Sequence, residues 1–272
     1  MSKLTSAALI AISLLTMGSA FAAERAKVVT FSKTYGGYQH VDDPASPDYG
    51  KETFVIAEGQ FHLTGEDNDS MTSVAFGELG AIVGSSLRQQ GFSPADSEDT
   101  ADVIIVVHRG RTAPEAERLN SGQELNHTPL APMAGPVQPV QPGVITINRS
   151  SGVTAGPVIV SGGNFEQIAR ILGFAQRFAD LEYDRGNRAT DYRYDEIVEE
   201  LSQPRYYIVL GAYDGRALRA NKRKVLLWET RLSFQAEKIS FAERYAAMIN
   251  GAARFFGQNT PAALDRRFVT ID

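Results

Sequence analysis

Stretches of alternating hydrophobic and polar residues predict β-strands at several places in the chain. Alternation places every second side chain on the same face of a sheet, and it occurs in residues 53–63 and 224–235. We interpret residues 27–33 and 206–213 as strands as well. Residues 101–108 instead contain an unbroken run of β-branched side chains, which is typical of a central strand covered on both faces.

Two of these strands carry a more specific signal. Gly59 interrupts the alternation in residues 53–63 and predicts a bulge or bend. In residues 224–235 the apolar positions, beginning with Leu226, share one face, and the polar positions, beginning with Glu229, share the other. We therefore expect one face of this strand in the core and the other in water.

Four segments repeat apolar residues at helical spacing. The spacing predicts helices over residues 71–90, 165–181 and 194–201, and Ser240 with Glu243 forms a capping box that opens a fourth. The resulting order, β-β-α-β-(insertion)-α-α-β-β-α, lacks regular strand–helix–strand alternation. We predict an α+β domain in which helices pack against a mixed β-sheet.

The hydrophobic pattern stops between residues 111 and 163. This stretch is rich in Pro, Gly, Gln and Ser, a composition that buries too little apolar surface to form a core. We interpret it as an insertion or mobile loop within a single domain of residues 23–272. Residues 144–148 and 157–160 could pair inside it as a small hairpin.

The segment 1–22 has the features of a secretory signal peptide. Lys3 supplies a positive charge, residues 4–17 are apolar, and an A-x-A sequence ends at Ala22. The apolar stretch is shorter than the roughly 20 residues of a spanning helix. We therefore expect cleavage before Ala23 and export to the periplasm or the medium, with no transmembrane segment in the mature chain.

Composition narrows the possible functions further. The net charge of −5 gives no basic face for nucleic acid, and 43% hydrophobic residues suffice for a core. The absence of Cys excludes disulfides, a thiol nucleophile and a lipid-bearing N-terminal Cys. The four His residues lack the spacing of metal ligands, and no nucleotide-binding motif occurs, so we expect neither a metal nor a cofactor.

Six short landmarks follow one another along the mature chain, namely residues 101–110, 172–174, 206–209, 212–214, 227–231 and 255–257. Taken together they resemble a family of exported bacterial proteins of unknown function. More loosely, the chain is similar to small envelope lipoproteins, although it lacks their lipid-bearing Cys. The resemblance implies an envelope location and an α+β fold, and it implies no catalytic residues.

Polar residues that end two predicted strands form the candidate binding site. His108, Arg109 and Arg111 follow the central strand, where they could hold an anion or share a proton. Asp214 and Arg216 end another strand and could face the same edge, with Asp214 pairing with an arginine or orienting His108. The same residues also fit a strand that turns polar on reaching water and an ordinary Asp-Gly turn.

A dense group of cations follows Asp214 on this acidic protein. Its members are Arg216, Arg219, Lys222, Arg223 and Lys224. They could contact anionic lipid, lipopolysaccharide phosphates or an acidic protein partner. The alternative is a solvated hairpin tip whose charges protect the strand edges.

These observations support three hypotheses about function. The first is a non-catalytic periplasmic or envelope protein that binds a partner, because no recognisable catalytic set accompanies the export signal. The second is an envelope hydrolase or transferase centred on His108, Arg109, Arg111 and Asp214. The third is a small-ligand carrier, which requires an apolar pocket.

Overall fold

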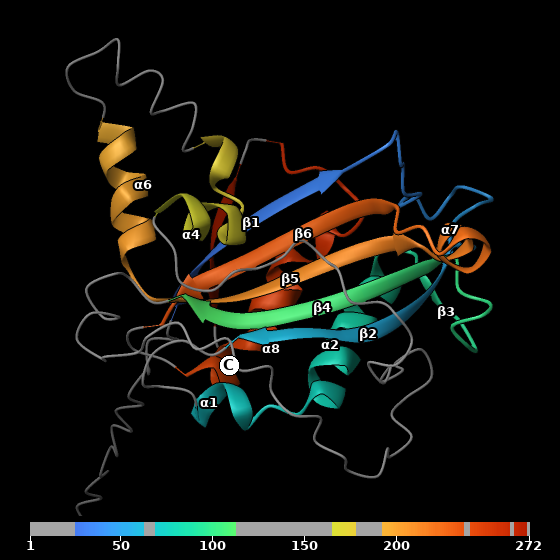
Figure 1. Cartoon of the computed structure of the whole chain (residues 1–272), viewed down its shortest axis with the longest axis horizontal. Coiled ribbons are helices and arrows are strands. Elements are labelled where there is room, and N and C mark those ends of the chain that lie inside the picture. The colour runs from blue at the N-terminus through green and yellow to red at the C-terminus, as the bar shows by residue number, and fades with distance from the viewer. Residues whose placement is uncertain are drawn as a thin grey trace, which may run out of the picture.

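A seven-stranded mixed sheet forms the centre of the computed structural model (Figure 1), which describes residues 25–62, 69–112, 165–177, 192–236, 240–261 and 264–270. The strands are β1 (Arg25–Thr34), β2 (Thr53–His62), β3 (Ser93–Pro94), β4 (Val103–Thr112), β5 (Arg205–Asp214), β6 (Leu226–Gln235) and β7 (Asp265–Thr270). The helices are α1 (Asp69–Thr72), α2 (Phe76–Gln89), α4 (Phe165–Leu172), α6 (Tyr192–Ser202), α7 (Gly215–Asn221) and α8 (Phe241–Ala252), followed by the short 3₁₀ helix η2 (Ala253–Phe255). The predicted α+β class is confirmed.

The direction of pairing changes at β4. The sheet order is β3-β2-β4-β5-β6-β1-β7. β2 runs parallel to β3 and β4, whereas β4, β5, β6, β1 and β7 pair in antiparallel fashion. The C-terminal end of β5 therefore lies beside the start of β4, and this arrangement decides where the polar residues meet.

The two faces of the sheet are covered by different helices. α2 and α8 pack on one face through apolar side chains such as Leu79 and Met248, which join Trp228 in the largest core cluster. α4 and α6 pack on the other face, where Ile168 and Ile197 lie in a second cluster. Burial of this kind contributes roughly 25 cal/mol for each Å² of apolar surface, so both helix layers hold the sheet chiefly through apolar contact.

The second face is not in water at β6, contrary to the expectation from its polar pattern. Glu229 and Arg231 are only 7% and 9% exposed. Arg231 donates to Glu229 and to the carbonyls of Arg170 and Ile171 in the last turn of α4, while the Tyr35 hydroxyl donates to Glu229. The charges thus cap a helix C-terminus, which carries unpaired carbonyls, and the alternation gave no sign of that partner.

Two places in the sheet contain bulges. The register between β2 and β4 shifts between Glu58 and Phe61, which confirms the predicted irregularity at Gly59. A second shift in β6 places Leu226 opposite Tyr213, and the two pack in a cluster on the face away from Trp228. The prediction that Leu226 and Trp228 share a face was wrong for this reason.

Three predicted boundaries change in the structure. The expected helix 71–90 is divided into α1 and α2, and the expected helix 165–181 has a break at Gly173, whose φ of +84° ends α4. β7 was not predicted, because its arginine-rich sequence lacks the apolar pattern of a buried strand. β4 extends to Thr112 and takes the first two residues from the proposed insertion.

Other predictions fall on residues that the structure does not describe. They are the signal peptide 1–22, the remainder of the insertion and the small hairpin within it. Among the described helices, none has the length and apolar content needed to cross a membrane.

Candidate functional site

The predicted site residues lie at opposite ends of β4. Asp214 pairs with Val103 at the start of the strand, whereas His108 pairs with Val209 further along. Five residues of strand separate the two positions, or roughly 16 Å at about 3.3 Å per residue. The expectation that Asp214 pairs with Arg109 or Arg111, or orients His108, was therefore wrong. Because β4 and β5 are antiparallel, the end of β5 lies beside the start of β4 (Figure 1).

At the far end of β4, Arg109 is buried and bound to the protein itself. Its Nη1 donates to the Val74 carbonyl at 2.7 Å, and its guanidinium lies 4.5 Å from the centre of the Phe61 ring. Burial lowers the pKa of Arg109, and Glu58 at 3.9 Å partly opposes that shift. This cation therefore joins β2, β4 and the segment after α1, and it is only 7% exposed.

His108 and Arg111 at the same end are also buried. The His108 Nδ1 accepts a hydrogen bond from the backbone N–H of Gln60 at 2.9 Å, and the ring lies directly against Gly59. His108 is 3% exposed and Arg111 is 7% exposed. The alternative interpretation, a strand that turns polar as it reaches water, is therefore wrong as well.

The other end of β4 borders a pocket of about 460 Å³. It lies where β2 and β4 begin, where β5 ends and where α7 starts. The polar side chains that line it include Tyr38, His40, Glu52, Asp102, Asp214 and Arg216. Two residues of the predicted site, Asp214 and Arg216, therefore border a cavity, together with four that sequence analysis did not select.

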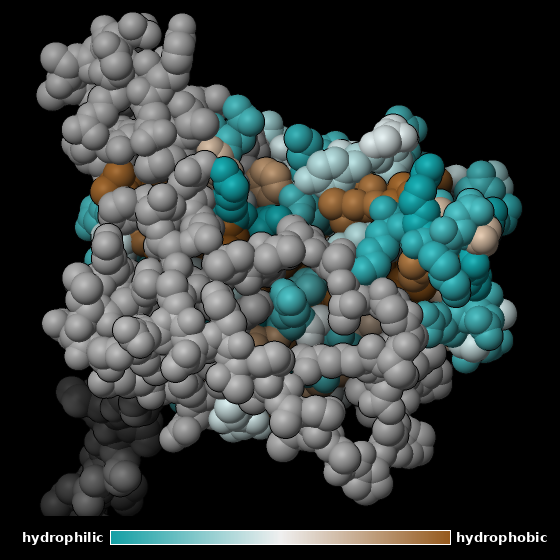
Figure 2. Space-filling view, in the orientation of Figure 1, coloured by the Kyte–Doolittle hydropathy of each residue, from teal (hydrophilic) through white to brown (hydrophobic). Residues whose placement is uncertain are grey.

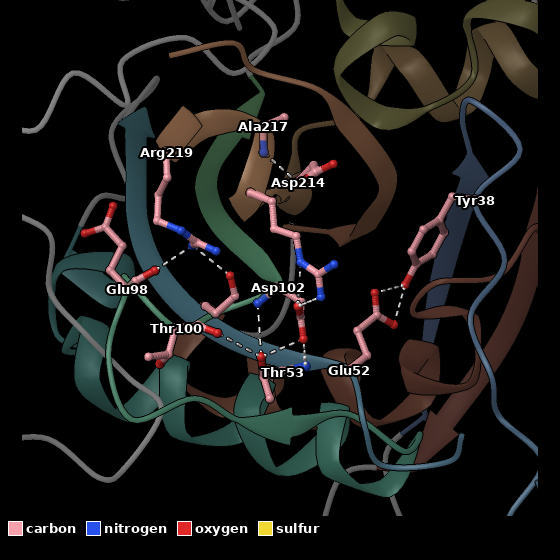
Figure 3. Close-up of polar contacts among 11 residues, drawn as sticks. Tyr38, Glu52, Thr53, Glu98, Thr100, Asp102, Asp214, Ala217 and Arg219 are labelled. Atoms are coloured by element: carbon pink, nitrogen blue, oxygen red, sulfur yellow. Dashed lines mark hydrogen bonds and ion pairs between the residues drawn. The ribbon is translucent and has the colours of Figure 1, made fainter. Parts of the chain in front are cut away.

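Asp102 is the centre of this group (Figure 3). One carboxylate oxygen accepts from the Thr53 amide at 3.1 Å and the Thr53 hydroxyl at 2.9 Å. The other accepts from Arg216 Nε at 3.2 Å and Nη2 at 2.7 Å. Partial burial acts to raise the pKa of Asp102, but the bonds from Thr53 and Arg216 outweigh it and hold the pKa below its usual range.

α7 holds Arg216 over the pocket. Asp214 is the N-cap of this helix and accepts from the Ala217 amide at 2.9 Å, a role for which Asp is well suited. Arg219 donates from Nη1 to the carbonyls of Glu98 and Ala101 at 2.9 and 2.8 Å. The expected hairpin tip is thus a short helix, since Asp-Gly serves here as a cap and first helical residue.

Glu52 fixes the opposite wall of the pocket. The Tyr38 hydroxyl donates to both of its oxygens at 2.9 and 2.8 Å. His40 places Nδ1 2.8 Å from Glu52 and Nε2 2.7 Å from the Gln90 carbonyl, and its ring stacks on Phe92 at 3.7 Å. Burial and then Glu52 raise the pKa of Tyr38, so the phenol stays a donor and the ring is held in place.

The cations that follow Asp214 have different surroundings. Arg216 bonds to Asp102, and Arg219 bonds to backbone carbonyls. Lys222 and Arg223 are exposed and Lys224 is half-buried. This end of the molecule is mainly hydrophilic with smaller hydrophobic areas (Figure 2).

Three carboxylates that line the pocket are held by hydrogen bonds from the protein. Glu52, Asp102 and Asp214 each accept at least one of them. No three His, Asp or Glu residues converge on a possible metal position in the described part of the chain. The sequence contained one signal for this pocket, since Asp102 directly precedes the β-branched run of the central strand.

Comparisons with known proteins add little to this geometry. No protein-family model and no curated protein matches the chain. Two solved structures, the PelC dodecamer from Paraburkholderia phytofirmans and a variant of it, are 6% and 5% identical, with TM-scores of 0.31 and 0.32. Each alignment covers 86% of this chain and 99% of the PelC chain, and TM-scores this low do not establish a common fold.

Proposed function

We propose that the protein is an exported, non-catalytic binding protein of the bacterial envelope, whose ligand occupies the pocket beside Asp102 and Arg216. The observation that carries the proposal is this ion pair. Thr53 anchors the carboxylate, and α7 presents the guanidinium with its side chain 80% exposed. A fixed carboxylate beside an accessible guanidinium is the arrangement expected of a ligand site that is already formed before the ligand binds.

The size and lining of the pocket support a small polar ligand. Its volume falls within the range of about 300–1,000 Å³ for small-molecule sites. Val41 and Leu227 are its aliphatic lining residues, among a majority of polar ones. A carrier of apolar molecules would need a more hydrophobic lining, so the polar-ligand form of the binding hypothesis is favoured.

A fragment screen of residues 23–272 tests the site. ¹H–¹⁵N spectra recorded with small polar fragments should show shifts concentrated at residues 38–41, 51–52, 102 and 214–216. Arg216→Ala should weaken the binding of those fragments, whereas Arg223→Ala, which removes the same charge from an exposed neighbouring position, should not. Fragment shifts confined to other parts of the surface would overturn the proposal.

The export part of the proposal is tested separately. Expression of the full chain in a Gram-negative host, followed by fractionation and N-terminal sequencing, should give a periplasmic protein that begins at Ala23. An uncleaved cytoplasmic product would contradict export without affecting the pocket.

A further inference from the structure

We infer that the pocket binds a neutral, hydroxyl-rich ligand of the saccharide or polyol class. This inference rests on the proposed function, because it names the chemistry of the ligand for the same pocket. It follows from three properties of the lining, namely how its charges are paired, how donors and acceptors alternate, and where its apolar wall lies.

Two ion pairs of opposite charge line the pocket. Arg216 pairs with Asp102 at 2.7 Å, and Lys51 pairs with Asp48 at 2.9 Å. Glu52 is held by the Tyr38 hydroxyl and His40. A charged ligand would compete with these partners, whereas a neutral ligand leaves each pair in place.

Each pair also presents a donor beside an acceptor. Arg216 turns Nε and Nη2 toward Asp102 and has five N–H donors in all, and a carboxylate such as Asp214 has about four acceptor positions. One oxygen of Asp214 accepts the hydrogen bond that caps α7. A hydroxyl group donates and accepts at once, so adjacent hydroxyls match the alternation of Arg216 and Asp214.

The opposite wall offers apolar contact. Tyr38 is half-buried and fixed by its two bonds to Glu52, and Leu227 lies in the same lining. A pyranose ring has one face of C–H groups and an edge of hydroxyls. Packing the C–H face against Tyr38 and Leu227 would bury apolar area and direct the hydroxyl edge toward Arg216 and Asp214.

The test compares neutral and charged probes on the same protein. ¹H–¹⁵N spectra of residues 23–272 are titrated with glucose, galactose and N-acetylglucosamine, and in parallel with ethylammonium chloride and sodium acetate at matched ionic strength. We expect at least one saccharide to shift the Arg216 Nε–H and the amides of residues 38–41. Its affinity should be nearly independent of salt, because no net charge is exchanged.

Two variants separate the ligand classes. Arg216→Ala should weaken saccharide binding about tenfold or more, the effect of losing a hydrogen bond to a charged group. Asp214→Asn keeps the α7 cap, since Asn is an equally good N-cap, so it should weaken a saccharide only a few-fold but abolish binding of a cation. Arg223→Ala is the control and should leave the affinity unchanged.

Each outcome is decisive. Saccharide shifts at the pocket that disappear in Arg216→Ala support the inference. Shifts at the pocket from ethylammonium or acetate alone would overturn the ligand class and leave the proposed binding function standing. If none of the five probes shifts the pocket residues, the inference fails, and the fragment screen decides whether the binding function fails with it.

Discussion

Arginine side chains lie near both ends of β4, but one group is buried and the other is exposed. At one end, Arg109 and Arg111 are buried, and Arg109 contacts a backbone carbonyl and an aromatic ring. At the other, Arg216 is 80% exposed in its side chain and pairs with a carboxylate at the edge of a pocket. Cations of the same kind therefore support the fold at one end and can meet a ligand at the other.

The difference shows that residue type alone does not locate a site. His108, Arg109 and Arg111 looked suitable for an anion because they follow a strand, yet all three are buried, and none of them lines the pocket beside Asp102. Asp102 and Glu52 were not selected from the sequence. Asp102 organises the pocket through bonds to Thr53 and Arg216, which are far from it in the sequence, and Glu52 bonds to His40. Four substitutions test this contrast.

The largest effect is expected from Arg109→Ala. It removes the donor to the Val74 carbonyl and the packing on Phe61, so it should lower the free energy of unfolding by about 2–4 kcal/mol. Urea denaturation measures the change, with exposed Arg88→Ala as a control that stays within about 0.5 kcal/mol. Ligand binding by the folded fraction should not change, and a loss of binding without destabilisation would reverse our assignment of the two ends.

Gly59→Ala should have the next largest effect. A Cβ at this position would lie 2.7 Å from His108 Nδ1, which forces the ring or the bulge to move and should cost about 1–3 kcal/mol. A double-mutant cycle with His108→Ala checks the cause, because the smaller side chain removes the clash. Strictly additive effects would show that the cost arises elsewhere.

Asp102→Asn should destabilise the protein by about 1 kcal/mol near neutral pH, the usual cost of a weakened hydrogen-bond group. The pKa of Asp102 is lower in the folded state than in the unfolded state. Its stabilising effect is therefore complete above the unfolded pKa of about 4 and is lost as the pH falls through the folded pKa. Unfolding curves at several pH values should show the two proteins converging in acid, and a difference independent of pH would contradict this account.

The smallest effect is expected from Arg216→Ala. An exposed ion pair is worth less than about 1 kcal/mol and is further weakened by salt, and Asp102 keeps its two bonds from Thr53. Thermal unfolding should place this variant between Arg223→Ala and Asp102→Asn in stability. If Arg216→Ala were the more destabilising of the pocket variants, Arg216 would be a structural residue and the contrast between the two ends would weaken.

Local sequence patterns predicted the strands and helices well, but they did not predict which residues come together in the fold. The strand predicted over residues 206–213 and the capping box at Ser240 correspond to β5 and α8. The position of Asp214 relative to His108 depended on whether β4 and β5 are parallel, and no local pattern encodes that direction. The same holds for the burial of Glu229, because the helix end that Arg231 caps lies about sixty residues earlier in the chain.

The placement of β1 has a consequence for the order of events during synthesis. β1 pairs with β6 on one side and β7 on the other, as in the pairs Val29–Ser233 and Val29–Arg266. The ribosome therefore releases β1 long before either neighbour has been made, and its apolar residues have no sheet to join in the meantime. Pairings this distant in sequence form slowly, so this half of the sheet is completed only after the last strand has been made.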